Sequence, residues 1–278
     1  MSISDFKIVF DSSADIATIK DVDFASAPLK IITSEKEYVD DKNLDVKQMI
    51  EELYEYKGRS SSSCPSPLDW YDSFGNAKCV FCVSLTSKLS GSYNAALLAK
   101  NDYEENFPDR RVYVIDTLSA GPGVRMMVEK LRELILEERD FGEICRMAEE
   151  YKSKTEVYFV LESLNNFANN GRVSPSVAKM ANMFGIRIIG KANKGELKPL
   201  LKSCGEKKSL ASLLERIENA GYNGGKVRIA HCMNEDAAKK VAIDIRKRYE
   251  ESDIKIYHTR GLCSFYAEKG GLLVGFEK

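Results

Sequence analysis

The stretch Ser87-Lys88-Leu89-Ser90-Gly91-Ser92-Tyr93-Asn94-Ala95-Ala96 joins a short apolar run to a helical pattern. Before it, Cys79 to Val83 has the length and composition of a buried strand. After it, Ser92 to Tyr103 has apolar residues three or four apart, as in a helix. Loops that follow strands in open α/β sheets are where ligand-binding groups gather. This stretch therefore predicts an α/β fold and directs attention to the strand ends.

The alternation of strand and helix continues along the chain. Further strands are predicted at Phe6 to Phe10, Val112 to Ile115, Val157 to Leu161, Ile186 to Ile189, Val227 to Ala230 and Ile254 to Tyr257. Further helices are predicted at Val46 to Tyr56, Val124 to Glu138, Phe141 to Lys152, Ser209 to Ala220 and Asp236 to Tyr249. This alternation favours βαβ units and a largely parallel sheet. With 278 residues, a boundary near Ser153 to Thr155 predicts two domains, 1–155 and 156–278.

Composition excludes several classes of protein. The chain is 44% hydrophobic and nearly neutral, with 41 Lys and Arg against 42 Asp and Glu, which argues against disorder, nucleic-acid binding and a polybasic membrane anchor. No apolar run approaches the roughly 18 residues of a spanning helix, and the start lacks a signal-peptide pattern. An odd cysteine count of 7 favours a reducing cytoplasm. With only two histidines, His231 and His258, a histidine-cluster mechanism is nearly excluded.

Hydroxyl groups are concentrated where predicted strands end. They occur in Asp11-Ser12-Ser13-Ala14-Asp15, in Ser84 to Ser92, in Asp116-Thr117-Leu118-Ser119 and in the run Ser60 to Ser63. Hydroxyls and free backbone N–H groups at a helix start can hold an anion. Each serine could equally be an ordinary helix cap. Several such clusters in one chain favour a carboxylate or phosphate site.

Motifs for other chemistries are missing or weak. The chain has no phosphate-binding P-loop and no dinucleotide fingerprint, so no cofactor is predicted, and no metal motif is found. Cys79 and Cys82 match a CxxC spacing but lie within a predicted strand, so their side chains face opposite sides and a structural role is expected. A hydrolase or phosphotransferase using Asp11, Asp116, Ser90 and His258 stays open as an alternative.

The strand-end motifs, taken in order, resemble the DegV family of fatty-acid-binding proteins over nearly the whole chain. The similar segments are Asp11-Ser12-Ser13-Ala14-Asp15, Ala27-Pro28-Leu29, Tyr38-Val39-Asp40, Ser62-Ser63-Cys64-Pro65-Ser66-Pro67, Ser87 to Ala96, Val114-Ile115-Asp116-Thr117 and Leu164 to Ser174. The segment Ser87 to Ala96 is the most specific of them. Single motifs are weak signals, but their shared order is a strong one.

The resemblance implies a non-catalytic carrier with two α/β domains. The N-terminal domain would have three α/β/α layers around a mainly parallel sheet, and the C-terminal domain two layers. One long-chain fatty acid would lie in an apolar tunnel between them, its carboxylate held by Ser62 or Ser63 and Ser90, with His258 nearby. The acid would be presented to a separate ATP-dependent fatty acid kinase. Arg172 would then dock the kinase or face its phosphate, outside the wall of the tunnel.

Four positions depart from the family pattern. Ser62 replaces Thr and keeps the hydroxyl, and Asn170 replaces a Gly in a turn that we expect to be left-handed at both Asn170 and Gly171. Cys204 replaces an Arg and would alter the kinase contact if that Arg makes one. Arg260 enters the loop after His258, where it could pair with the head group of a different anionic lipid. A carrier of such a lipid is therefore a third hypothesis.

Overall fold

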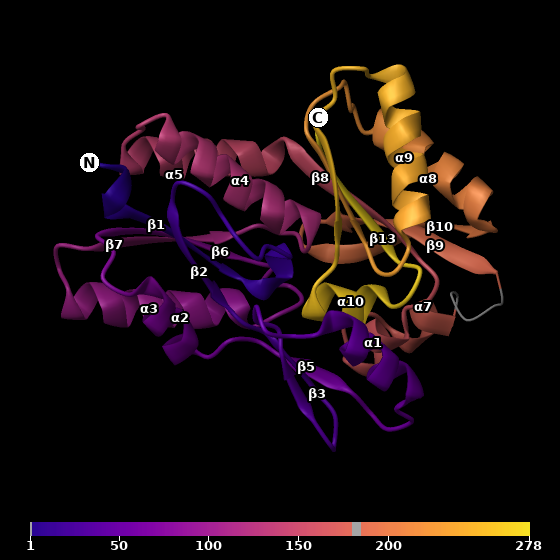
Figure 1. Ribbon diagram of the computed structural model, residues 1–278, viewed down its shortest axis with the longest axis horizontal. Helices are drawn as coiled ribbons and strands as arrows, with labels where there is room; N and C mark the ends of the chain where they lie inside the picture. The colour runs from indigo at the N-terminus through magenta and orange to yellow at the C-terminus, as the bar shows by residue number, and fades with distance from the viewer. Residues whose placement is uncertain (1, 180–184) are drawn as a thin grey trace.

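The first half of the chain forms a three-layer α/β/α unit in the computed structural model, which describes residues 2–179 and 185–278. Its sheet has the order β2-β1-β6-β7, with all neighbours parallel. The strands are β1 (Phe6–Asp11), β2 (Asp23–Ala27), β6 (Cys79–Ser84) and β7 (Arg111–Asp116). The covering helices are α2 (Pro67–Phe74) and α3 (Ser92–Asn106) on one face, and α4 (Pro122–Leu136) and α5 (Phe141–Ser153) on the other (Figure 1). The predicted fold class is confirmed.

The second half forms a larger sheet that is mostly antiparallel. Its order is β10-β9-β8-β13-β11-β12, and only β11 and β12 are parallel neighbours. The strands are β8 (Thr155–Leu161), β9 (Ile186–Asn193), β10 (Glu196–Cys204), β11 (Val227–His231), β12 (Ile254–His258) and β13 (Leu272–Glu277). Helices α8 (Glu206–Asn219) and α9 (Glu235–Arg248) cover one face. The largely parallel sheet expected from the alternation is the first sheet, whereas the second is mixed and contains the β9–β10 hairpin.

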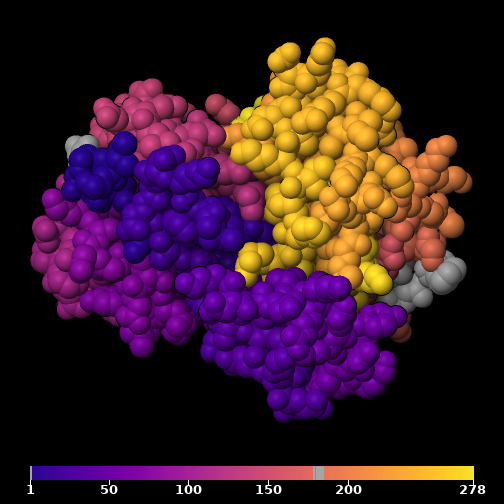
Figure 2. Space-filling view, in the orientation of Figure 1, coloured from indigo at the N-terminus to yellow at the C-terminus, as the bar shows by residue number. Residues whose placement is uncertain are grey.

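A small lobe lies below both sheets in the views of Figures 1 and 2. It consists of β3 (Lys30–Ile32), β4 (Glu37–Val39), β5 (Ser61–Ser63) and α1 (Val46–Glu55). Helix α10 (Gly261–Ala267) packs against it from the C-terminal half. The remaining helices are η1 (Ile3–Asp5), η2 (Ser12–Ala14), α6 (Asn165–Asn169) and α7 (Pro175–Lys179). Within the described residues, no helix combines the length and apolarity needed to cross a membrane.

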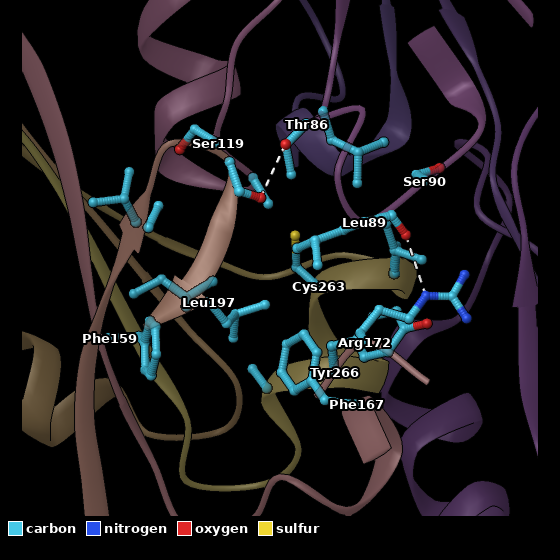
Figure 3. A pocket seen from close by; sticks show the side chains of 18 of the residues that line it. Thr86, Leu89, Ser90, Ser119, Phe159, Phe167, Arg172, Leu197, Cys263 and Tyr266 are labelled. Carbon is cyan, nitrogen blue, oxygen red and sulfur yellow. Dashed lines mark hydrogen bonds between the residues drawn. The ribbon is translucent and has the colours of Figure 1, made fainter. Parts of the chain in front are cut away.

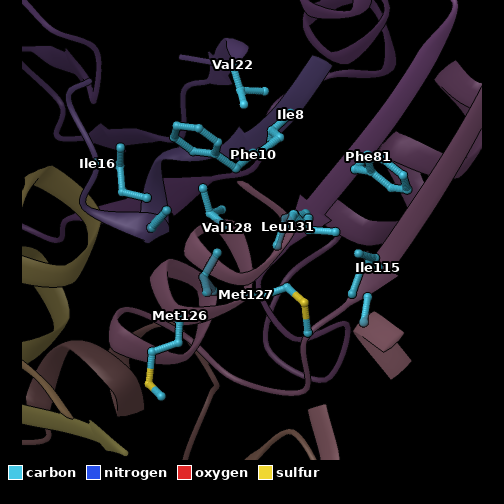
Figure 4. Packing of buried hydrophobic residues seen from close by; sticks show 14 of the residues in the cluster. Ile8, Phe10, Ile16, Val22, Phe81, Ile115, Met126, Met127, Val128 and Leu131 are labelled. Atoms are coloured by element: carbon cyan, nitrogen blue, oxygen red, sulfur yellow. The ribbon is translucent and has the colours of Figure 1, made fainter. Parts of the chain in front are cut away.

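Helix α4 connects the two halves because it packs on both sheets. Met127 and Leu131 lie in the core cluster that includes Ile8 and Phe81 of the parallel sheet (Figure 4). Met126 belongs to the same cluster and also approaches β13, since a Cβ at Gly275 would lie 2.9 Å from its Sδ. The CxxC pair also follows the predicted pattern: Cys79 belongs to this cluster and Cys82 to the cluster on the opposite face.

The polar side of α4 forms ion pairs with the second sheet. Arg228 of β11 is almost fully buried, and its guanidinium lies 2.7 Å from both Glu129 of α4 and Asp253. Lys226 Nζ lies 2.7 Å from Glu133 Oε1, one turn further along α4. A buried charge needs such partners, since an unpaired one is costly. Apolar and ionic contacts together therefore fix the orientation of the two sheets.

The close approach of β13 to α4 predicts a strong effect of one added methyl group. A Cβ at Gly275 would lie 2.8 Å from Pro122 Cβ and 2.9 Å from Met126 Sδ. We expect Gly275→Ala to lower the free energy of unfolding by about 1–3 kcal/mol through overpacking. Gly142→Ala is the matched control, because the first neighbour of its Cβ is 3.4 Å away and alanine favours its helix. Equal urea denaturation midpoints for the two variants would contradict the packing described.

Candidate functional site

A cavity lies between the two sheets, at the carboxyl ends of the parallel strands. It encloses about 100 Å³, less than the roughly 300 Å³ at the lower end of small-molecule pockets. Most of its lining is apolar and comes from both halves, including Leu85 and Leu89 from the first and Phe159, Leu161 and Leu197 from the second (Figure 3). Because opposite walls belong to different sheets, a small separation of the halves would widen the cavity.

Four of the polar groups in the lining lie on one side of the cavity, whereas Thr86 and Ser119 lie away from them (Figure 3). Ser62 Oγ and Tyr266 OH are 2.7 Å apart and share a hydrogen bond. Ser90 and Arg172 lie on the same side, away from Phe159 and Ser119 (Figure 3). Burial raises the pKa of Tyr266, so its hydroxyl stays protonated and can donate. This side offers three hydroxyls and one guanidinium, which suits an anionic group.

Local structure explains how Ser62 and Ser90 reach the cavity. Ser62 lies in the middle of β5, which pairs with β3. Ser90 lies two residues before α3 and accepts a hydrogen bond from the N–H of Ser92 at 3.2 Å. Ser92 Oγ in turn donates to buried Asp11 Oδ2 at 2.8 Å. The loop that carries Ser90 is thus tied to the end of β1.

Ser63 and His258 do not line this cavity. Ser63 follows Ser62 in a strand, where successive side chains point to opposite faces. His258 ends β12 on the surface, and its ring centroid lies 4.3 Å from that of His231. Of the four residues predicted for a carboxylate, the structure therefore brings two, Ser62 and Ser90, to the cavity.

Arg172 does line the cavity, contrary to the expectation that it lies outside the wall. Its Nε donates to the carbonyl of Leu89 at 3.2 Å, and its Nη1 donates to the carbonyl of Asn170 at 2.5 Å. The turn before it also differs from the prediction. Gly171 has φ +72°, but Asn170 has φ −102°, because its side-chain amide donates to the carbonyl of Asn166 at 2.9 Å. A docking role for Arg172 stays a prediction.

The residues of the enzymatic alternative hold loops in place. Asp11 accepts hydrogen bonds from Ser13 Oγ, Leu85 N and Ser92 Oγ. Asp116 Oδ1 accepts from the backbone N–H groups of Ser87 and Leu118. Among the described contacts, neither carboxylate bonds to Ser90 or to a histidine.

Arg260 contacts the N-terminal half and does not line the cavity. Its guanidinium donates to the carbonyl of Asp41, and its Nε lies 3.8 Å from Asp40 Oδ1. Asp40 also accepts hydrogen bonds from the N–H groups of Gly261 and Leu262 at 2.9 Å each. The loop that departs from the family pattern therefore attaches α10 to the small lobe. Cys204 is exposed at the end of β10.

Tyr266 is the site residue that sequence reasoning missed. It lies in α10, in the segment Gly261–Ala267, which carries no polar motif. Its hydroxyl reaches Ser62 from 204 positions away in the chain. No local sequence pattern predicts such a contact, because the contact depends on how the two halves pack together.

Comparison with known proteins identifies the family of the chain. The family model described as an uncharacterised protein, DegV family, matches residues 5–278. The chain belongs to the DegV family. A DegV domain-containing protein of Streptococcus pneumoniae strain R6 is 42% identical over 98% of this chain and 99% of its own length.

Two solved structures resemble this DegV protein closely. A DegV family protein from Eubacterium eligens, loaded with heptadecanoic acid, has a TM-score of 0.96 and 40% identity, covering 98% of this chain and 99% of that one. The Streptococcus pneumoniae Fatty Acid Kinase (Fak) B3 protein, loaded with linoleic acid, has a TM-score of 0.97 and 41% identity, covering 100% and 99%.

Asp15, beside the cavity residue Cys263, gives a prediction for pH dependence. Its Oδ1 accepts from the N–H of Arg260 at 2.6 Å, and its Oδ2 is buried. Burial raises the pKa of Asp15 to about 7. Since the folded-state pKa exceeds the unfolded one, its contribution to stability is full below about pH 4 and is lost as the pH rises through about 7.

We expect Asp15→Asn to remove this dependence, because the amide oxygen can still accept from Arg260 but cannot ionise. The free energy of unfolding of the variant, relative to the parent, should rise by a few kcal/mol, on the order of 3, between pH 5 and pH 7.5. Urea titrations at both pH values measure this difference. Asp102→Asn, at an exposed helix position, is the control. Parallel pH curves for Asp15→Asn and the parent would contradict the prediction.

Proposed function

We propose that this DegV protein binds one long-chain fatty acid, leaves it chemically unchanged and presents it to a separate fatty acid kinase. The observation that carries the proposal is an apolar cavity with Ser62, Tyr266, Ser90 and Arg172 on one side. Fatty-acid-loaded relatives with the same fold, one of them a fatty acid kinase B3 protein, support it.

The chemistry of a fatty acid matches both sides of the cavity. A carboxylate withdrawn from water needs several donors, because an unpaired buried charge is costly. Ser62, Tyr266, Ser90 and Arg172 can supply them. The tail requires only apolar walls, and each buried CH₂ contributes about 0.8 kcal/mol. That gain would offset the cost of moving the side chains of the two walls apart, which a long acyl chain requires.

We assign the carboxylate to Ser62 and Ser90, with Tyr266 as a third hydroxyl donor. Arg172 would stand at the boundary between the ligand and the partner, because it lines the cavity and is only partly buried. It would thereby combine a contact to the acid with the docking role that the resemblance implies. Ser63 and His258 serve as comparison positions, since they lie outside the lining.

The domain organisation, the cellular location and the absence of catalysis belong to the same proposal. We infer two domains that meet near residue 155, the first residue of β8, since the acid would lie between them. We also infer a reducing cytoplasm, supported by the odd cysteine count of 7. An enzymatic function is disfavoured because Asp11 and Asp116 hold backbone N–H groups of loops.

The proposal predicts a stoichiometric lipid in the purified protein. The protein should be denatured and extracted, and the extract analysed by mass spectrometry against a known amount of chain. We expect close to one long-chain fatty acid per chain. A different anionic lipid at that ratio would favour the third hypothesis above, and an extract without lipid from a protein that also fails to bind added fatty acids would refute the proposal.

The two neighbouring serines of β5 provide a matched test of the carboxylate site. Ser62→Ala and Ser90→Ala should each weaken fatty acid binding by about 1–3 kcal/mol, since each removes a donor to a buried charge. Ser63→Ala should change affinity little, because Ser63 does not line the cavity. Displacement of a fluorescent fatty acid measures all three. An effect of Ser63→Ala larger than that of Ser62→Ala would contradict the assignment.

A further inference from the structure

A second concave site is rich in lysine and lies next to the apolar cavity described above, which we call the acyl cavity. It has a volume of about 300 Å³ and is lined by Lys152, Lys191, Lys194 and Lys278, with Glu156 as its one acidic side chain. We call the site that these four lysines line the lysine pocket. They come from the end of α5, from the β9–β10 hairpin and from the residue after β13. The fold therefore gathers four cations from three separate segments.

The carboxylates around the lysine pocket do not match its positive charge. Lys191 Nζ lies 3.2 Å from Glu156 Oε2, and Lys278 Nζ lies 3.1 Å from Glu156 Oε1. These two ammonium groups thus share a single carboxylate. Lys152 pairs with Glu149, which is outside the pocket, at 2.7 Å. Lys194 has no ion pair within the described part of the chain. An anion held between these groups would relieve their mutual repulsion.

The position of Lys194 is fixed by the hairpin turn. Lys194 and Gly195 have φ values of +50° and +88°. Thr86 Oγ1 of the N-terminal half donates to the carbonyl of Gly195 at 2.9 Å. A Cβ at Gly195 would lie 2.4 Å from the same Thr86 oxygen, so the turn and the N-terminal half are in close contact. Lys194 is therefore held at the edge of the pocket by contacts that do not involve its charge.

The pocket also contains hydroxyl groups. Thr117 and Ser119 line it on the side of the N-terminal half. Thr117 Oγ1 donates to the carbonyl of Ser84 at 2.9 Å, whereas Ser119 Oγ is buried and has no hydrogen-bond partner among residues 2–179 and 185–278. Ser119 also lines the acyl cavity, on the side away from Arg172 (Figure 3). The two sites are thus neighbours, but the lysine pocket is separate from the hydroxyls assigned to the carboxylate.

We propose that the lysine pocket is a binding site for a phosphate group. Lysine ammonium groups bind phosphate as point charges, and a dianion can accept from several of them at once. A fatty acid carboxylate carries one charge and is already provided for by Ser62, Ser90 and Tyr266. The phosphate can be free in solution or part of an anionic lipid head group, and both present the same oxygens to the lysines.

Two binding measurements distinguish the sources. The full-length protein is titrated with inorganic phosphate by isothermal calorimetry, and it is sedimented with vesicles of phosphatidylglycerol and phosphatidylcholine or of phosphatidylcholine alone. Binding of inorganic phosphate identifies a site for the free ion. Retention by the phosphatidylglycerol vesicles only, without measurable binding of inorganic phosphate, identifies a head-group site.

Paired charge removals test whether the lysine pocket is responsible. Lys191→Gln/Lys194→Gln should weaken whichever interaction is observed at least tenfold. The control Lys207→Gln/Lys208→Gln removes two exposed charges from α8. It should change the affinity of the observed interaction by less than twofold. Should the first double variant fail to fold, Lys194→Gln alone serves, since Lys194 is exposed and its charge is unpaired within the described chain. Absence of both interactions, or equal losses in test and control, would overturn the proposal.

Discussion

The carboxylate of Asp40 at the start of α10 is the contact on which the cavity depends. Asp40 belongs to the N-terminal half and is almost fully buried. Its carboxylate accepts hydrogen bonds from the N–H groups of Gly261 and Leu262 of the C-terminal half. Burial raises its pKa while those two N–H groups oppose the rise. The cost of burying a charge is offset only if α10 docks here. Docking places Leu262, Cys263, Tyr266 and Ala267 in the cavity wall, and with them the Ser62–Tyr266 hydrogen bond.

The two halves are held firmly together by α4, whereas the cavity between them is lined mostly by apolar side chains. Helix α4 packs on both sheets, and Arg228 and Lys226 pair with its glutamates, so the halves are held together on that side. On the cavity side, apolar side chains of the two halves form most of the lining, and hydrogen bonds such as Ser62–Tyr266 and Thr86–Gly195 join the halves around them. Apolar contacts are not directional, so they can be exchanged for contacts with an acyl chain.

The sequence predicted the regular elements well and the site in part. Every predicted strand and helix is present within a few residues, because each has an apolar period that local physics dictates. The strands of the small lobe were missed, since three residues are too few for a period, and the longer strands β2 and β13 were missed as well. Ser62 and Ser90 were named from the family resemblance, and the structure places both in the lining of the cavity, while their contact with a carboxylate stays a prediction. Tyr266 and the separation of His258 from the cavity depend on docking between distant segments, which no local pattern encodes.

The position of a fatty acid within the protein tests the account most directly. A crystal structure of the protein with a long-chain fatty acid brominated at its terminal carbon would locate both ends of the ligand, the bromine by its anomalous signal. The account predicts the carboxylate beside Ser62 and Ser90 and the bromine toward the side of the cavity where Phe159 and Ser119 lie (Figure 3). A bromine peak beside Ser62 and Tyr266, or density for the acid outside the space between the two sheets, would contradict it.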